Sequence, residues 1–278
     1  MTHDQPGPRG PFQTLILERV GPVDWLTLNR PERLNTLTGT MVRELCAYFQ
    51  GLQNDYSTRI VGLRGSGRAF CAGLDIKEHQ GGDRVPEGAG RTRPGYHLFD
   101  IVRLMRECPQ PIVALVHGPA CGGGFAIALA ADIRLVGESA RMNDAFITLG
   151  RSGCELGLTY FLPRIVGLGL AAEIMLTGGF VDAARAVAIG LASRAGADEE
   201  LATIAEAYIE PMLRSTPLGL RMTKQTLNRA LCVSDLAAVI DLEERAQAIC
   251  GRGPEFEEAM NAFLEKRPPR YNAETGAT

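Results

Sequence analysis

The chain of 278 residues has no excess of positive charge and no long apolar run. It has 29 Lys and Arg residues and 32 Asp and Glu residues. The resulting net charge of -3 argues against nucleic acid as a partner. No apolar run approaches the roughly 18 residues that a membrane helix needs. The first residues also lack the basic-then-apolar order of a signal peptide. The sequence therefore predicts a cytoplasmic protein with neither a nucleic-acid nor a membrane partner.

Cysteine and histidine are sparse and scattered. The seven cysteines are odd in number and form no Cys-x-x-Cys pair, which is typical of reduced thiols rather than of disulfides or a zinc site. His79, His97 and His117 show no ligand spacing, so no metal site is predicted. Residues 65–67, Gly-Ser-Gly, lack the third glycine of a dinucleotide fingerprint, and no nicotinamide site is inferred.

Two glycine-containing turns are the most informative features that are present. Residues 70–77, Phe-Cys-Ala-Gly-Leu-Asp-Ile-Lys, and residues 118–124, Gly-Pro-Ala-Cys-Gly-Gly-Gly, each follow a β-branched run typical of a buried strand. Each turn opens a helix-like stretch, whose first N–H groups are unpaired and lie at the positive end of the helix dipole. Such groups suit a carbonyl oxygen that becomes negative during a reaction, so the two turns predict an oxyanion hole.

Strands alternate with helices along most of the chain, and helices alone follow. Strand-like runs at 12–20 and 22–28 are separated by one glycine, and helical spacing of apolar residues covers 38–52 and 96–108. Residues 81–90 are too rich in Gly and Pro for regular structure. From 198 to about 266 the pattern is helical, with Thr216 and Ser234 as expected N-caps. These patterns predict an α/β protein with a helical C-terminal region.

Three motifs at 29–37, 67–78 and 120–124 closely resemble those of the crotonase superfamily, the enoyl-CoA hydratase/isomerase family. The resemblance covers nearly the whole chain and implies an α/β, crotonase-like spiral of ββα turns over residues 1–197. It implies a helical trimerisation region over 198–278, hence a homotrimer or a dimer of trimers. Amphipathic helices with no sheet left to cover fit self-association on physical grounds as well.

In this family two backbone N–H groups hold the thioester carbonyl of an acyl-CoA substrate. On this sequence they fall on Leu74 and Gly123. The resemblance also implies a coenzyme A groove along the first turn and the 33–34 region, with Lys77 or Arg33 near phosphate; an exposed helix position is the alternative for Lys77. The groove residues are Arg33, Leu34, Ala72, Asp75, Ile76 and Lys77. No permanently bound cofactor is implied, because coenzyme A arrives as part of the substrate.

The sequence departs from the family where hydratases carry their two catalytic glutamates. Ala126 stands at the first of these positions and Phe146 at the second. Neither side chain can move a proton, so syn addition of water by two carboxylates cannot run as it does in those hydratases.

A third position supplies a candidate acid or base. Residues 150–167 resemble the branch that contains dienoyl-CoA isomerases and 4-chlorobenzoyl-CoA dehalogenases, and Glu155 falls where those enzymes carry a catalytic aspartate. In an apolar pocket, desolvation would raise the pKa of this glutamate toward neutrality. The alternative is that Glu155 caps the helix expected over 156–165.

Other polar residues have structural interpretations. Asp144 adjoins Phe146, but strand alternation would turn it away, and Asp132 is expected in an ion pair or a turn. His97 follows the loop that borders the acyl pocket in the family. Two hypotheses remain: an enzyme that stabilises a thioester enolate and moves a proton through Glu155, or an acyl-CoA-binding protein that has lost the chemistry. Burying a carboxylate beside the reactive carbons costs free energy, and a protein that only binds acyl-CoA would have no need for one there. Glu155 therefore favours the enzyme.

Overall fold

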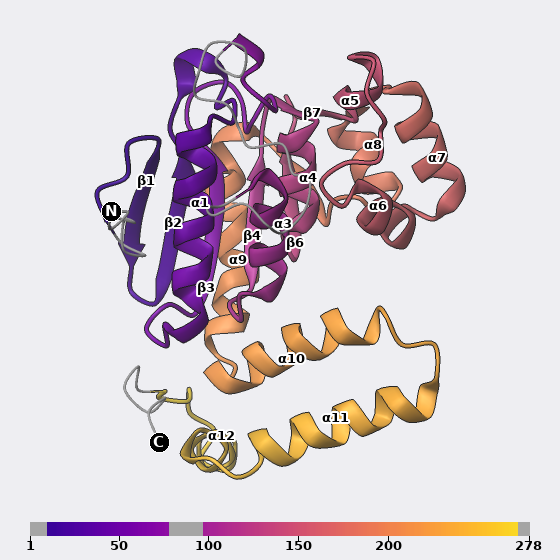
Figure 1. The fold of residues 1–278 in the computed structure, drawn as a ribbon. Coiled ribbons are helices and arrows are strands. Elements are labelled where there is room, and N and C mark those ends of the chain that lie inside the picture. The colour runs from indigo at the N-terminus through magenta and orange to yellow at the C-terminus, as the bar shows by residue number, and fades with distance from the viewer. Residues whose placement is uncertain (1–9, 78–96, 272–278) are drawn as a thin grey trace, which may run out of the picture.

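A six-stranded sheet forms the centre of the computed structural model, which describes residues 10–77 and 97–271 (Figure 1). Only the first pair of strands is antiparallel, joined by a tight turn at Gly21-Pro22; the others run parallel. The strands lie in the order β1 (Leu15–Val20), β2 (Val23–Leu28), β3 (Ile60–Gly65), β4 (Ile112–Val116), β6 (Ile133–Gly137) and β9 (Arg194–Gly196). The two strands expected around Gly21 are confirmed, each shorter than its apolar run.

A second sheet arises because the chain repeats the order strand, strand, helix. β5 (Pro119–Cys121) follows β4 and leads into α4 (Gly123–Ala130). β7 (Arg141–Asn143) follows β6 and leads into α5 (Ala145–Thr148). β5 and β7 pair in parallel, and β8 (Val181–Asp182) joins β7. The expected α/β class with repeated ββα turns is confirmed.

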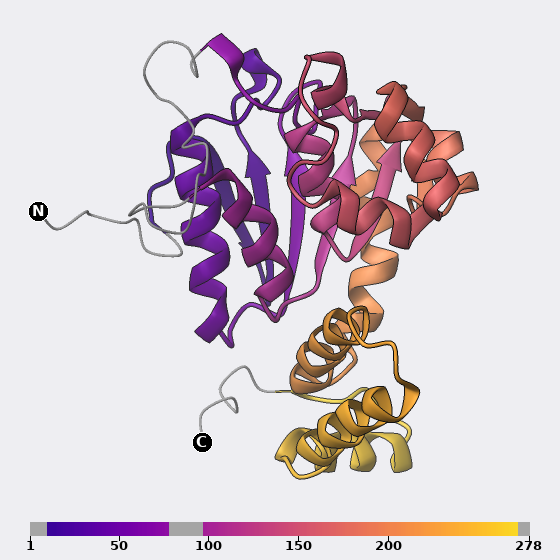
Figure 2. The same ribbon diagram turned by 45° about the vertical axis from the view of Figure 1, so that its right-hand side comes forward.

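Helices cover both faces of the main sheet because strand residues alternate between two cores. Ile112, Ala114 and Val116 of β4 belong to the core formed with α1 (Gly39–Gly51) and α3 (Leu98–Glu107). Val113 and Leu115 belong to the core formed with α9 (Leu201–Leu213). Figure 2 shows α9 behind the sheet. Short 3-10 turns lie at Pro31–Arg33, Leu52–Asn54 and Asp198–Glu200.

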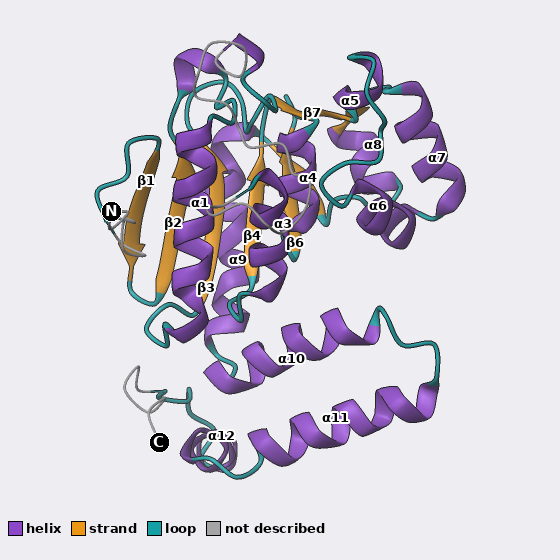
Figure 3. Cartoon of the chain, in the orientation of Figure 1, coloured by secondary structure: helices purple, strands orange, loops and turns teal. Residues whose placement is uncertain are grey.

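Three helices surround the second sheet, and three more end the chain. The first group is α6 (Leu158–Val166), α7 (Leu168–Thr177) and α8 (Ala183–Ala188); the second is α10 (Pro217–Ala230), α11 (Leu236–Cys250) and α12 (Pro254–Leu264). The C-terminal region is helical as expected (Figure 3), and α10 to α12 extend beyond one end of the sheet. The division of the chain at residue 197 stays a prediction.

The helix caps of the C-terminal region match the sequence at one position and differ at another. The Thr216 side chain accepts a hydrogen bond from the N–H of Gly219 at 3.0 Å, which confirms the expected cap of α10. α11 is capped by Asp235, whose carboxylate accepts from the N–H groups of Ala237 and Ala238. The prediction of Ser234 was wrong by one residue, because the backbone enters the helix only after Asp235.

α10 is fastened to the core by a buried lysine. Lys224 Nζ donates to the carbonyls of Met105 at 3.0 Å and Gln110 at 2.8 Å, and pairs with Asp132 at 2.9 Å. Asp132 also pairs with Arg106 at 2.8 Å, which confirms its expected role. A buried ammonium needs such partners, so this contact fixes the start of the C-terminal region on the sheet domain. Within the described part of the chain, no helix is long and apolar enough to cross a membrane.

Candidate active site

The two glycine-containing turns lie side by side. The N–H of Cys71 donates to the carbonyl of Pro119 at 3.1 Å, and the N–H of Cys121 donates to the carbonyl of Cys71 at 3.0 Å. The first turn is held from its other side by Leu37, whose N–H donates to the carbonyl of Gly73 at 2.7 Å. Segments that are some 50 positions apart in the sequence thus share one short stretch of backbone pairing.

Glycine is required where the turns touch. Gly73 has a φ of +95°, in the region that side chains disfavour, and a Cβ there would lie 2.8 Å from the Cys121 carbonyl oxygen. A Cβ on Gly124 would lie 1.9 Å from the Cys71 carbonyl oxygen, well inside contact distance. The absence of side chains at these positions is what allows the two backbones to approach.

The N–H groups of Leu74 and Gly123 are available to a ligand. Neither donates a hydrogen bond to an acceptor in residues 10–77 or 97–271. Gly123 is the first residue of α4, where helix geometry leaves N–H groups unpaired and the dipole is positive. An ideal Cβ on Gly73, next to Leu74, would lie 3.6 Å from the Gly123 nitrogen, so the two donors sit on adjoining turns.

A cavity of about 310 Å³ opens at these turns and is mostly apolar. Leu74 and Gly123 both line it, and so does Glu155. The other described lining residues are Ala72, Gly73, Ile76, Leu98, Phe99, Cys121, Gly122, Ala145, Phe146, Leu149 and Arg151. The cavity therefore joins both predicted N–H donors and the predicted acid or base in one enclosure.

Glu155 lies in the loop before α6 and does not cap that helix. Its side chain is 12% exposed and accepts a hydrogen bond from Arg151 at 3.4 Å. α6 begins at Leu158, and its N-cap is Gly157, which has a φ of +82° and offers no side chain. The structure thus leaves the carboxylate in the cavity wall and removes the capping alternative.

Apolar side chains occupy the two positions where the resemblance implies glutamates in hydratases. Ala126 is fully buried in α4, and Phe146, on α5, forms part of the cavity wall. Among the described lining residues Glu155 is the one carboxylate. Burial raises the pKa of the Cys121 thiol, which also lines the cavity, to about 11, so it stays neutral and is a poor nucleophile at pH 7.

Comparison with known proteins shows which family has this sequence and fold. The model of the family "Enoyl-CoA hydratase/isomerase" matches residues 19–274. The chain belongs to this family. It is similar to "Probable enoyl-CoA hydratase EchA12" of Mycobacterium tuberculosis (strain ATCC 25618 / H37Rv), at 38% identity over 97% of this chain and 96% of the relative.

Further relatives extend the range of named activities and confirm the fold. "1,2-Epoxyphenylacetyl-CoA isomerase" of Escherichia coli (strain K12) is 32% identical over 88% of this chain and 93% of its own. The crystal structure of the enoyl-CoA hydratase of Bacillus anthracis superposes with a TM-score of 0.86 at 29% identity, covering 94% of this chain and all of that one. The chain is thus an enoyl-CoA hydratase/isomerase-type enzyme with the fold that the motifs implied.

The residues expected along the coenzyme A groove divide into two groups in this hydratase/isomerase family member. Ala72 and Ile76 line the cavity, whereas the exposed Arg33 and Lys77 and the half-buried Leu34 are not among its described lining residues. Asp75 is buried, and its carboxylate pairs with Arg30 at 3.1 Å and accepts from the Thr36 hydroxyl at 3.0 Å. Asp75 therefore braces the first turn against the 30–36 segment instead of facing the cavity.

The remaining candidates have structural contacts. Asp144 precedes α5, and its Oδ1 accepts from the N–H of Phe146 at 3.1 Å, so its structural role is confirmed, although through a helix cap and not through strand alternation. His117 Nε2 lies 2.8 Å from the Gly67 carbonyl. His97 is the N-cap residue of α3, and His79 and the loop at 81–90 lie outside the described residues.

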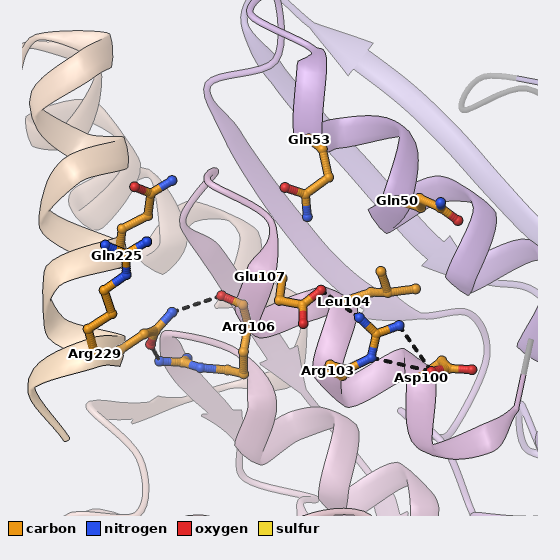
Figure 4. A pocket seen from close by; sticks show the side chains of 10 residues that line it. Gln50, Gln53, Asp100, Arg103, Leu104, Arg106, Glu107, Gln225 and Arg229 are labelled. Atoms are coloured by element: carbon orange, nitrogen blue, oxygen red, sulfur yellow. Dashed lines mark hydrogen bonds and ion pairs between the residues drawn. The ribbon is translucent and has the colours of Figure 1, made fainter. Parts of the chain in front are cut away.

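A second cavity of about 670 Å³, lined mainly by charged and amide-bearing residues, lies between α1, α3 and α10 (Figure 4). Its cations are largely paired: Arg103 pairs with Asp100 at 3.1 Å and with Glu107 at 2.7 Å, and Arg106 bonds Asn228. No residue of the two turns lines it. Among residues 10–77 and 97–271, no group of three His, Cys, Asp or Glu side chains is placed to hold a metal ion.

Proposed function

We propose that the enzyme binds an acyl-CoA thioester, stabilises its enolate at the N–H groups of Leu74 and Gly123, and moves a proton through Glu155. The observation that carries this proposal is the single cavity lined by all three residues. Two backbone donors on adjoining turns match one oxyanion, and donors preorganised in an apolar site act strongly on developing charge. Glu155 is the proton carrier because it is the described carboxylate in the same wall.

One carboxylate favours proton shuttling within the substrate. Isomerisation of an enoyl-CoA takes a proton from one carbon of the enolate system and returns it to another, which a single base can do. Hydration by the two-carboxylate route needs a second group, and Ala126 and Phe146 cannot supply it. Isomerisation of an enoyl-CoA is therefore the first activity to assay, with hydration as the second.

The coenzyme A portion would lie along the first turn, with Ala72, Leu74 and Ile76 contacting the pantetheine end. Arg33 and Lys77 are exposed near this turn and would contact phosphate, where a cation gains a charge-assisted hydrogen bond. The carboxylate of Asp75 pairs with Arg30, so Asp75 would contribute to the groove through its backbone. Leu34 would contribute through its backbone as well.

Replacing Glu155 by glutamine tests the role of the carboxylate. Glu155→Gln keeps size and hydrogen bonding but cannot exchange a proton at neutral pH, so turnover of enoyl-CoA substrates should fall by about 10²–10⁴ while acyl-CoA affinity stays near normal. Glu138→Gln, at an exposed position after β6, serves as the control and should leave turnover unchanged. Steady-state kinetics and calorimetry with a saturated acyl-CoA give the two readings.

Two results would contradict this function. Activity that survives Glu155→Gln would show that another group carries the proton. Wild-type protein that binds acyl-CoA but converts no enoyl-CoA of any chain length would point instead to a binding protein, for which the apolar residues at positions 126 and 146 would be the reason.

A further inference from the structure

Asp144 is a buried carboxyl group with one oxygen unused. Its residue exposure is 0%, and Oδ1 accepts the N–H of Phe146 at the start of α5. Oδ2 is also buried and has no hydrogen-bond partner within the described part of the chain. Helix capping therefore accounts for one oxygen and leaves the other buried without a partner, which is unfavourable for a polar group.

The unused oxygen points at the loop that carries Glu155. An ideal Cβ on Gly153 would lie 2.5 Å from Asp144 Oδ2 and 3.0 Å from the Met175 carbonyl. The lack of a side chain at position 153 thus makes room for the carboxyl group. Glu155 follows two residues later and faces the cavity, so the Asp144 carboxyl packs behind the wall in which Glu155 stands.

Among the described residues, few other charged side chains lie on the elements around Asp144. On the same loop, Arg151 pairs with Glu155 at 3.4 Å. On α7, which supplies the Met175 carbonyl, Glu173 pairs with Arg185 at 2.7 Å. On β7, Arg141 lies 3.9 Å from Asp182, and the neighbouring Asn143 is uncharged. Glu155 is the described negative group that interacts electrostatically with Asp144.

The titration of Asp144 agrees with this arrangement. Burial raises its pKa from 3.8 to about 6, the negative charge of Glu155 adds to the rise, and the backbone N–H groups of Phe146 and Ile147 oppose it. Coulombic coupling between two sites is reciprocal, so a charge on Asp144 must act equally on Glu155.

We propose that Asp144 is a positioning residue for Glu155: its buried charge, packed behind the loop, opposes ionisation of Glu155 and makes that carboxylate a stronger base. This proposal rests on the proposed function of Glu155. When Glu155 takes a proton from the substrate, its repulsion with Asp144 is relieved, and the proton is held more firmly. Asp144 itself touches neither the cavity nor the substrate, since it is absent from the described cavity lining.

Asp144→Asn separates this role from helix capping, because asparagine caps a helix as well as aspartate but carries no charge. The acid limb of the pH profile of kcat should move to lower pH by about 0.5–1 unit, and kcat on the plateau should fall about two- to fivefold as the base weakens. KM should change little. Asp182→Asn is the matched control, since Asp182 caps α8 in the same way and belongs to the exposed side of β8. It should leave the profile unchanged.

The reciprocal measurement does not depend on turnover. In Glu155→Gln protein with carboxyl-labelled aspartate, the pKa of Asp144 read by NMR should fall by the same 0.5–1 unit or so. This reading keeps Asp144 in place, so it decides the question even where Asp144→Asn does not fold. A pH profile and an Asp144 titration that both stay unchanged would overturn the proposal. Full activity in Glu155→Gln with a lowered Asp144 pKa would overturn the proposed function and leave the coupling intact.

Discussion

At the scale of single residues, the site depends most on the glycines at which the backbones of the two turns lie too close together for a side chain. Gly124→Ala would place a methyl group 1.9 Å from the Cys71 carbonyl oxygen, so the two turns must separate. We expect a loss of stability of about 1–3 kcal/mol or more, and a loss of turnover because the donors no longer converge. Urea unfolding and kinetics measure both.

Gly169→Ala is the matched control. Gly169 lies in α7, and a Cβ there would meet nothing within 4 Å. Alanine in a helix lowers the entropy of the unfolded chain, so this variant should be neutral or more stable by about 0.5–1 kcal/mol. Equal destabilisation by the two substitutions would mean that the close approach of the turns is not what position 124 protects.

Asp144 also predicts a pH dependence of stability. A carboxyl group whose pKa rises from 3.8 to about 6 on folding binds its proton more tightly in the folded state, so stability falls as pH rises through that window and then levels off. The Asp144→Asn variant has no carboxyl group to ionise at this position, so it does not undergo this loss of stability. It should be more stable than wild type at pH 7–8 by about 1–2 kcal/mol, with the difference shrinking toward pH 4. Urea midpoints across this range decide it, and a constant difference would place the pKa of Asp144 elsewhere.

The site residues that could be predicted from the sequence are those that lie within a motif of consecutive residues. Leu74, Gly123 and Glu155 could each be placed from a motif of consecutive residues, and all three line one cavity. Phe99 and Arg151 could not, because their positions in the wall depend on how α3 and the loop after α5 pack. The brace between Asp75 and Arg30 was missed for the same reason: its partners are 45 positions apart, and no local pattern marks them.

At the scale of elements, strands and helices were predictable where apolar periodicity is strong, and their ends were not. α1 and α3 lie inside the ranges expected for them, whereas the start of α11 was misplaced between two adjacent capping residues. Asp235→Ala removes the carboxylate that accepts the N–H groups of Ala237 and Ala238, and should cost about 1 kcal/mol. Ser234→Ala should cost almost nothing. Thermal or urea unfolding of the two variants tests the assignment, which the reverse order of stability would contradict.

At the scale of the whole molecule, the fold was predictable because the motifs that build the site also define the repeated strand, strand and helix units. α9 shows where the sequence was ambiguous. Its helical pattern resembles that of the three helices after it, yet Leu201, Ala205 and Ile209 are buried against the main sheet. Only α10 to α12 lie beyond the sheet, and periodicity alone does not say which helix has a sheet to cover.

α10 to α12 expose apolar side chains that a single chain does not cover. Phe263 is 78% exposed and Leu264 71%, and the others include Leu227, Leu231, Leu236, Ile240, Ile249, Phe256 and Met260. An exposed set of this size is typical of an interface, and we propose that it is buried between copies as a trimer or a dimer of trimers. Light scattering should give three or six chain masses.

Phe263→Asp with Leu264→Asp should shift the protein toward monomer, because two charges would be buried without partners in the interface. Val20→Asp, at an exposed apolar position at the end of β1, is the control and should leave the mass unchanged. The ion pair between Glu258 of α12 and Arg267, at 2.6 Å, is untouched by the two substitutions. Far-UV circular dichroism should therefore show that the double variant retains its helices. A monomeric wild type, or an oligomer indifferent to both aspartates, would show that this face meets no second copy.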